Sequence, residues 1–197
     1  MLRRFVSGGA HILLVGCGSG RDLLVLAARG YVVTGVDPAG DALDTARRRL
    51  AERQLSATLI AGFFEDVPLS GRFDAISFSS SYSYIPESRR RIEALRKAAA
   101  HLAPNGHILL TYQVSRQPHR APVAFARVIG ALTRSDWRFE PGDLVRVLNG
   151  GGRTIDYLHV FSKGGIDAEA AAAGLRVVFR GDAPHEPLVT IAALALP

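Results

Sequence analysis

The stretch HILLVGCGSG, residues 11–20, joins a short apolar run to a loop with three glycines. An apolar run of this length, followed by glycines, is typical of a strand buried inside a parallel sheet. The residues after the loop predict a helix over 22–28, whose free backbone N–H groups would attract polar or anionic groups. The stretch therefore predicts a strand over 11–15, a glycine loop and a helix, with a ligand lying against the loop.

The glycine spacing separates two kinds of nucleotide site. Gly16, Gly18 and Gly20 give the pattern G-x-G-x-G, whereas a dinucleotide fingerprint needs its third glycine at position 21. That position is Arg21, so a nicotinamide oxidoreductase is the least favoured class of protein. Asp37 ends the next apolar run, where its carboxylate can accept hydrogen bonds from both hydroxyls of a ribose.

Beyond this stretch, apolar runs alternate with helical segments up to about residue 115, which is typical of βαβ units and a parallel sheet. We expect a doubly wound sheet. A strand–helix–strand–strand series should then complete the chain, its last two strands forming an antiparallel hairpin around a loop at 181–187. The further strands are expected over 31–36, 57–61, 73–79, 107–112, 157–161, 175–180 and 188–196, and the further helices over 41–54 (with Asp41 as a candidate N-cap), 87–101 (stopped by Pro104-Asn105-Gly106) and 167–173.

Residues 113–154 interrupt this alternation with about 40 residues that lack clear periodicity. The segment carries seven arginines against three acidic residues, together with Trp137. Such long insertions are usually functional. We expect one domain over 1–197, in which this insertion acts as a lid over an acceptor of aromatic or anionic character.

Composition limits the classes of protein further. The 197 residues are 48% apolar, which suits a packed globular domain. No apolar run approaches the roughly 20 residues that span a membrane, and the start of the chain does not resemble a secretion signal, so a cytoplasmic protein is expected. Cys17 is the single cysteine, which excludes an intramolecular disulfide, and no metal site is predicted. The net charge of +6 comes almost entirely from arginine, and the runs 47–49 and 89–91 are interpreted as solvated helix faces rather than nucleic-acid contacts.

Several motifs in a fixed order carry a resemblance to a known family. They are ILLVGCGSG (12–20), VTGVD (33–37), FDAISF (73–78), IPE (85–87) and LAPNGHILL (102–110). Over residues 11–112 the chain resembles the class I S-adenosylmethionine-dependent methyltransferases. The resemblance implies a three-layer α/β/α Rossmann-like sheet of about seven strands, the last antiparallel. It also implies S-adenosylmethionine as cofactor and S-adenosylhomocysteine as product.

The resemblance assigns binding roles residue by residue. Two positions depart from the family, which usually has acidic residues where this chain has Leu14 and Phe63. At the second position the backbone of Phe63 and Phe64 can still pair with adenine, and a ring can stack on it. The resemblance places Gly16, Cys17, Gly18 and Gly20 at the methionine and ribose portions, Asp37 at the ribose hydroxyls, Pro38 beside adenine, and Ser79 and Ser80 beside the methionine.

The chemistry asks little of the protein beyond orientation, because the sulfonium methyl group is already a strong electrophile. A general base would help a hydroxyl acceptor, and the candidates are His119, His159, Tyr82 and Tyr84. Residues 79–86 lack the Asn/Asp-Pro-Pro-Tyr pattern that holds a base amino group. Cys17 lies in the cofactor loop, which disfavours methylation at cytosine carbon 5.

These observations favour a small-molecule acceptor and leave O-, N- and C-methylation open. The first alternative is a non-catalytic protein that binds S-adenosylmethionine or S-adenosylhomocysteine, motivated by Leu14, Phe63 and the lack of an evident base. A nucleic-acid methyltransferase is less favoured. Only about ten residues precede the first strand, so the insertion, or the second subunit of a homodimer, is expected to cover the site.

Overall fold

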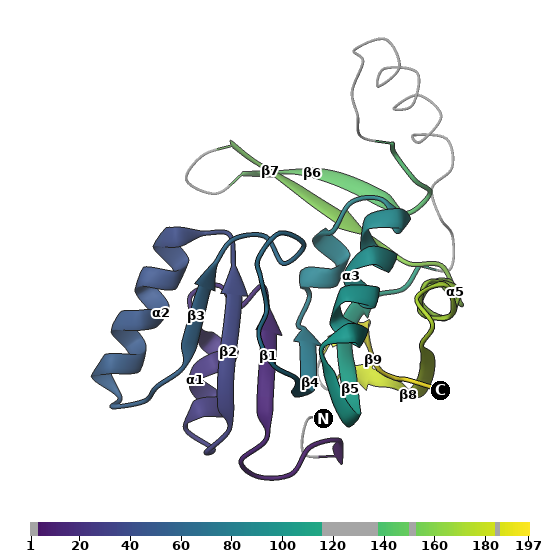
Figure 1. The fold of residues 1–197 in the computed structure, drawn as a ribbon. Coiled ribbons are helices and arrows are strands. Elements are labelled where there is room, and N and C mark those ends of the chain that lie inside the picture. The colour runs from purple at the N-terminus through teal and green to yellow at the C-terminus, as the bar shows by residue number, and fades with distance from the viewer. Residues whose placement is uncertain (1–3, 116–137, 150–152, 184–185) are drawn as a thin grey trace.

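A computed structural model describes residues 4–115, 138–149, 153–183 and 186–197, of which 146–149, 153–155 and 186–188 are described by their backbone alone. Seven strands form one mixed sheet in the order β3-β2-β1-β4-β5-β9-β8 (Figure 1). This confirms the doubly wound Rossmann-like fold. The strands are β1 (His11–Val15), β2 (Val32–Asp37), β3 (Thr58–Ala61), β4 (Phe73–Phe78), β5 (Leu102–Gln113), β8 (Arg176–Ala183) and β9 (Glu186–Ala195).

Helices cover both faces of this sheet. Alternate residues of a strand point to opposite faces, and β1 shows the result. Ile12 and Leu14 pack in a cluster with the buried leucines of α1, while Leu13 and Val15 pack in a cluster with α3 and α5. The strand is therefore apolar throughout because both faces are covered. The helices are α1 (Arg21–Ala27), α2 (Gly40–Glu52), α3 (Ser88–Ala100) and α5 (Gly165–Ala172).

The predicted antiparallel hairpin is present at the far edge of the sheet. β9 pairs antiparallel with β5 on one side and with β8 on the other. The two strands run closer to the turn than expected, up to Ala183 and from Glu186, so the loop predicted at 181–187 is shorter. The remaining five strands pair in parallel.

Two predicted boundaries were wrong. β5 begins at Leu102 rather than 107, because the Pro104-Asn105-Gly106 segment forms an irregularity within the strand instead of separating it from the helix. Asn105 takes a positive φ of 63° there. Helix α2 begins at Gly40, so Asp41 lies in its first turn and Ala39 occupies the N-cap position.

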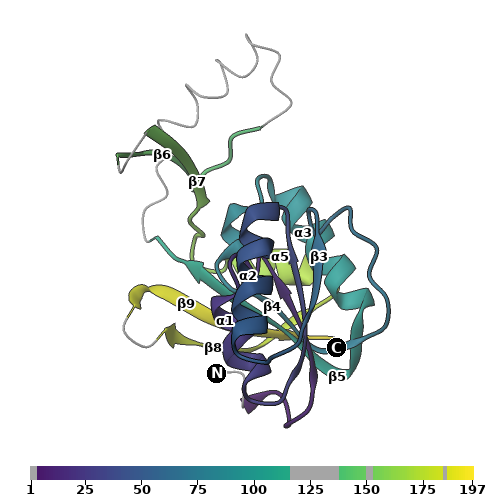
Figure 2. The same cartoon turned by 90° about the vertical axis from the view of Figure 1, so that its left-hand side faces the viewer.

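The segment without clear periodicity contains regular structure. β6 (Asp143–Asn149) and β7 (Arg153–His159) pair as a separate antiparallel hairpin, hereafter called the arm. The strand expected over 157–161 therefore starts earlier and ends at His159. In Figures 1 and 2 the arm lies beyond the carboxyl ends of the parallel strands. None of the helices in the described ranges is long and apolar enough to cross a membrane.

Candidate functional site

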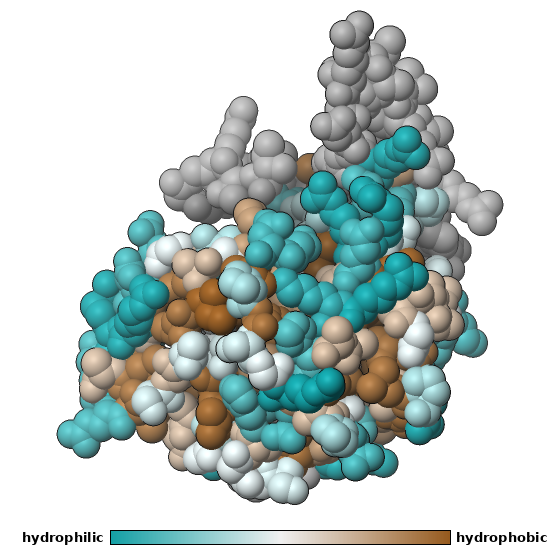
Figure 3. All heavy atoms as spheres, in the orientation of Figure 1, coloured by the Kyte–Doolittle hydropathy of each residue, from teal (hydrophilic) through white to brown (hydrophobic). Residues whose placement is uncertain are grey.

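A cleft of about 940 Å³ opens where the parallel strands end. It is bordered by the ends of β1 and β2, the loop after β3, the segment after β4 and the first turns of α3. Hydrophobic residues show on the face between α2 and α3, with hydrophilic residues around them (Figure 3). The residues predicted for the site that line this cleft are Gly16, Asp37, Pro38, Phe63, Phe64, Ser79, Ser80 and Tyr84.

Asp37 holds the glycine loop in place from the end of β2. Its side chain is buried, and its two carboxylate oxygens accept hydrogen bonds from the N–H groups of Gly18 (2.7 Å) and Ala39 (2.9 Å). A carboxylate has about four acceptor positions, so each oxygen keeps capacity for another donor. Asp37 is therefore fixed by its neighbours while still able to accept two hydroxyl groups from the cleft.

The glycines of the loop have different structural duties. A Cβ at Gly16 would lie 2.6 Å from Cβ of Ser81, so the loop can approach the segment after β4 only without a side chain. A Cβ at Gly20 would lie 2.9 Å from Cβ of Ala46, where α1 and α2 pack together. Both residues also have positive φ angles. Gly16 thus borders the cleft, whereas Gly20 serves helix packing and does not line it.

Cys17 packs inward, beside β2. A Cβ on Gly35 would lie 2.7 Å from its sulfur, and Cys17 lines a small neighbouring hollow rather than the main cleft. Burial, with the negative charge of Asp37, raises the pKa of Cys17 to about 12. The thiol therefore stays protonated at neutral pH and is a poor nucleophile.

The loop after β3 presents one aromatic ring to the cleft. Phe63 is 61% exposed, whereas Phe64 is buried and packs edge-on against Phe78 with ring centroids 5.3 Å apart. Stacking on a ligand is thus open to Phe63, while the ring of Phe64 belongs to the core.

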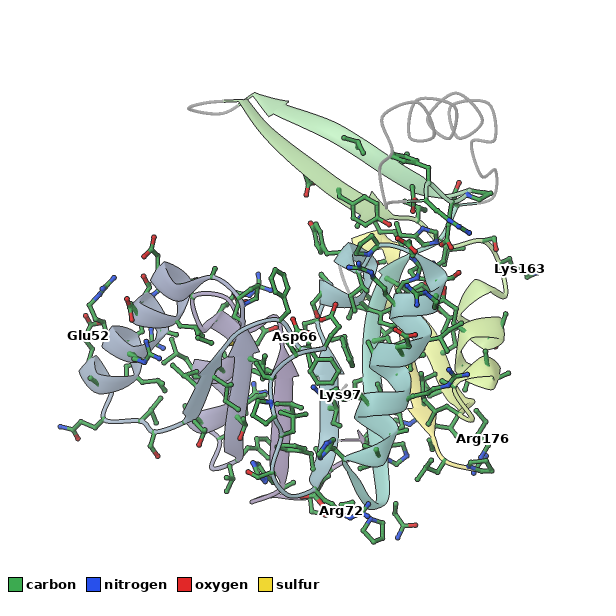
Figure 4. The ribbon with its side chains drawn as sticks, turned by 45° about the horizontal axis from the view of Figure 1, so that its top comes forward. Glu52, Asp66, Arg72, Lys97, Lys163 and Arg176 are labelled. Carbon is green, nitrogen blue, oxygen red and sulfur yellow. The ribbon has the colours of Figure 1, made fainter. Side chains whose placement is uncertain are left out.

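Lys97 of α3 holds the loop after β3 in place. Its ammonium group donates hydrogen bonds to the carbonyl oxygens of Phe64, Glu65 and Val67, at 2.7 to 3.0 Å. In Figure 4 Lys97 lies near the loop that carries Asp66. Burial lowers the pKa of Lys97, an effect that the acidic residues of the loop oppose. Sequence reasoning did not identify this residue.

The serines after β4 are held by hydrogen bonds to neighbouring strands. The backbone N–H of Ser80 donates to Thr111 on β5 (2.6 Å), and the hydroxyl of Ser81 donates to the carbonyl of Val15 at the end of β1 (2.6 Å). Residues Ser81–Tyr84 then form a 3₁₀ turn, η2. These contacts bring the turn against the glycine loop and the cleft.

The four candidate bases lie in different places. Tyr84 is 47% exposed and lines the cleft. Tyr82 is fully buried and donates to Glu169 (2.6 Å), and His159 is buried with its Nδ1 2.6 Å from a carboxylate oxygen of Asp143. Neither borders the cleft, because aromatic rings of the core and a carboxylate partner enclose each. His119 lies outside the described residues.

A buried ion-pair network surrounds Arg91, the third residue of the arginine run on α3. Arg89 and Arg90 are exposed as predicted. Arg91 is only 1% exposed, because successive residues of a helix point in different directions and this one faces the core. Its guanidinium contacts Glu169 of α5 (2.8 Å) and Glu140 (2.9 Å), which precedes the arm. Glu140 also accepts hydrogen bonds from the backbone and hydroxyl of Ser88.

The same network reaches the base of the arm. Asp143 accepts from the backbone of Glu140 (2.8 Å) and from Tyr157 (2.8 Å), and Nε2 of His159 lies 3.5 Å from the guanidinium of Arg91. Residues far apart in the sequence meet here, so no local pattern could have predicted the network. Within the described ranges, no group of three His, Cys, Asp or Glu side chains is arranged to hold a metal ion.

Comparison with known sequences gives one family and several relatives. Residues 12–106 match the sequence model of a family described as "Methyltransferase domain". The cypemycin N-terminal methyltransferase of a Streptomyces species is 31% identical over 103 residues. The ubiquinone biosynthesis O-methyltransferase of Coxiella burnetii is 31% identical over 104 residues. These alignments cover 52% of this chain but 41% and 43% of the relatives, so the chain matches less than half of their length.

Solved structures resemble this chain over nearly all of its length. An S-adenosylmethionine-dependent methyltransferase of Methanosarcina mazei superposes with a TM-score of 0.76 at 18% identity, covering 99% of this chain and 96% of its own. The glycopeptide N-methyltransferase MtfA, solved with S-adenosylmethionine, gives a TM-score of 0.73 at 19% identity, covering 100% and 84%. At these identities the likeness establishes the fold.

Proposed function

We propose that this chain transfers a methyl group from S-adenosylmethionine to a small-molecule acceptor, because residues 12–106 match the sequence model of a family described as "Methyltransferase domain". The single observation that carries the proposal is Asp37, whose carboxylate borders the cleft and is oriented by two backbone N–H donors. S-adenosylmethionine is the cofactor of this family, and S-adenosylhomocysteine is the product that it leaves.

The residues around the cleft fit this cofactor chemically. The carboxylate of Asp37 suits the two hydroxyls of a ribose, and the exposed ring of Phe63 suits a purine. Ser79 and Ser80 offer hydroxyl and backbone groups for the amino-acid portion. Leu14, where the family usually has an acidic residue, is packed in the core beside α1 and offers nothing to the cleft.

The bound cofactor supplies an electrophilic methyl group, and the chain's own residues supply binding, orientation and exclusion of water. Of the candidate bases in the described ranges, only Tyr84 borders the cleft. We therefore infer that orientation dominates and that Tyr84 lines the pocket near the acceptor.

The proposal of a small-molecule acceptor is supported by the names of the relatives, which refer to cypemycin, ubiquinone and a glycopeptide. An acceptor with an aromatic portion would suit the exposed rings of Phe63 and Tyr84. The lid and an anionic acceptor remain predictions from the sequence, since Trp137 and four of the seven arginines of 113–154 lie outside the described residues.

A second candidate function is a protein that binds the cofactor without turnover. The burial of Tyr82 and His159 favours it, because it removes two of the four candidate bases from the cleft. Release of S-adenosylhomocysteine from S-adenosylmethionine in the presence of acceptor mixtures would eliminate this alternative.

The cofactor site can be tested by calorimetry with S-adenosylmethionine, S-adenosylhomocysteine and NADH. We expect the first two to bind and NADH to be silent. Asp37→Asn should weaken binding by about 10- to 100-fold, because one charged hydrogen-bond acceptor is worth about 1.5–3 kcal/mol. Asp182→Asn, at an exposed position on β8, is the matched control and should bind like the wild type. A folded wild-type protein that binds neither sulfur compound contradicts the proposal.

A further inference from the structure

A second hollow of about 100 Å³ adjoins the cleft at the ends of β4 and β5. Ser80 and Tyr84 line both spaces, so the hollow lies directly beyond the cleft on the side of β5. It can hold a small chemical group but not a whole ligand. The other residues around it are Ser83, Thr111, Tyr112, Gln113, Leu158 and Val189.

Ser83 has a buried hydroxyl without a partner. The residue is 2% exposed, and its Oγ makes no hydrogen bond within the described part of the chain. A buried hydroxyl that lacks a partner costs about 1–3 kcal/mol, so such groups are rare unless a ligand satisfies them.

The turn that carries Ser83 is held by bonds on both sides of it. Ser81 donates to Val15, Tyr82 donates to Glu169, and the backbone N–H of Ser83 donates to the carbonyl of Ser80 at 3.2 Å. Ser83 is thus one of the residues around the hollow, and it belongs to a turn that is itself anchored. Binding sites are usually largely pre-formed in this way.

The hollow also selects by charge. None of the eight side chains described around it carries a charge at neutral pH. The hydroxyl of Thr111 already accepts from Ser80, and that of Tyr112 accepts from Arg180 at 3.2 Å. A charged group placed here would lose its hydration without gaining a counter-charge, whereas a neutral hydrogen-bonding group would satisfy Ser83.

We propose that this hollow recognises the methyl acceptor, taking an uncharged hydroxyl or amide group whose apolar, flat body rests on the exposed ring of Tyr84. Ser83 is the specificity-determining residue. This inference rests on the proposed function, since it names the chemical class of acceptor for the same site. It assigns the neutral end of the acceptor to the β5 side of the cleft, away from Asp37.

Stability of the unliganded protein gives the first test. Ser83→Ala should leave the free energy of unfolding unchanged or raise it by about 1 kcal/mol, because the hydroxyl that it removes has no partner. Ser70→Ala, at an exposed loop position, is the control and should be neutral. A loss of more than about 1 kcal/mol in Ser83→Ala would mean that the hydroxyl has a structural partner, and it would overturn the proposal.

Ligand binding gives the second test. Benzyl alcohol, benzamide and benzoate share a ring and differ in the polar group, and each is titrated by ligand-observed NMR into protein saturated with S-adenosylhomocysteine. The alcohol and the amide should bind at least tenfold more tightly than benzoate. Ser83→Ala should weaken both by about fivefold or more, while Ser70→Ala should not.

The outcomes separate this inference from the proposed function. Equal affinities for the three probes, preference for benzoate, no binding of any probe to the wild type, or unchanged affinities in Ser83→Ala each overturn the role of the hollow. Absence of S-adenosylhomocysteine binding instead contradicts the proposed function. In that case the same titrations in the ligand-free protein still decide whether the hollow prefers uncharged groups.

Discussion

Gly35 lies in the middle of β2, at a point where the glycine loop and α1 leave no room for a side chain. A Cβ there would lie 2.7 Å from the sulfur of Cys17 and 2.9 Å from a methyl carbon of Leu23. The residue pairs with Leu14 of β1, so a shift would be felt by the strand that leads into the cleft. Close packing at this glycine therefore links the core to the position of the cofactor loop.

Gly35→Ala should lower the free energy of unfolding by about 1–3 kcal/mol, because added volume in a packed core forces its neighbours to move. Gly40→Ala is the matched control. Gly40 begins α2, and a Cβ there meets nothing within 4 Å. The control should be neutral or stabilising by up to about 1 kcal/mol. Urea unfolding measures both, and equal midpoints would contradict the packing described for Gly35.

At the scale of the elements, a network of charged side chains joins the base of the arm to the body of the protein. Arg91 of α3 contacts Glu169 of α5 and Glu140 beside the arm, and its guanidinium carbon lies 5.3 Å from the ring centre of Phe161. A two-stranded hairpin is marginally stable alone. The buried network thus supplies the tertiary contacts that hold the base of the arm.

Arg91→Met should destabilise the protein by about 3–5 kcal/mol, since it leaves the buried carboxylate of Glu169 and the partly buried one of Glu140 without their counter-charge. Arg90→Met removes the same charge from the exposed face of the same helix and should cost less than about 0.5 kcal/mol. Thermal unfolding compares the two variants. Similar losses would mean that the charge of the helix, rather than the buried network, accounts for the effect.

The sequence predicted those elements whose signals are local. The apolar runs and the G-x-G-x-G loop placed β1 to β4 and their helices within a few residues. The pairing of the arm was missed, because the sequence predicted only the later part of β7 and nothing of β6, although the Asn149-Gly150-Gly151-Gly152 turn signal follows four apolar residues in β6. Arg146 and Asp156 lie inside these strands and break up their apolar residues, so neither strand shows a regular alternation of apolar and polar residues.

The candidate site was predictable to a similar degree. Asp37 ends a strand and Phe63 follows the next one, so both could be placed at the edge of the sheet from sequence alone. The burial of Tyr82 and Arg91 could not, because each depends on Glu169, which lies about 80 residues later in the chain. Ser83 carried no signal, since only the three-dimensional structure shows that its hydroxyl lacks a partner.

At the scale of the whole molecule, the network makes the stability of the protein depend on pH. Burial raises the pKa of Glu140, but hydrogen bonds from Ser88 and the charge of Arg91 outweigh it and hold the value below the ordinary range. For Asp143 the same opposition by burial is outweighed by bonds from His159, Glu140 and Tyr157. A carboxyl whose pKa is lower in the folded state stabilises that state above its unfolded-state pKa.

The contribution of these two carboxyls to the free energy of unfolding should therefore be constant above about pH 5. It should fall as the pH drops through about 4, toward the lowered pKa values. Urea unfolding between pH 7 and pH 3 measures the slope. Glu140→Gln should be less stable at pH 7 but should lose less on acidification, since it no longer takes up that proton. A variant with the slope of the wild type would show that other carboxyls dominate.

The order of the sheet also affects how the chain folds during synthesis. β9 lies between β5 and β8, yet it follows both of them along the chain. Until the ribosome has released residues 186–195, the partial sheet ends at β5 with unpaired backbone groups, and β8 has no neighbour to bind. An unpaired strand edge invites pairing with another chain. Late completion of the sheet thus makes the nascent chain, rather than the finished protein, the form most exposed to aggregation.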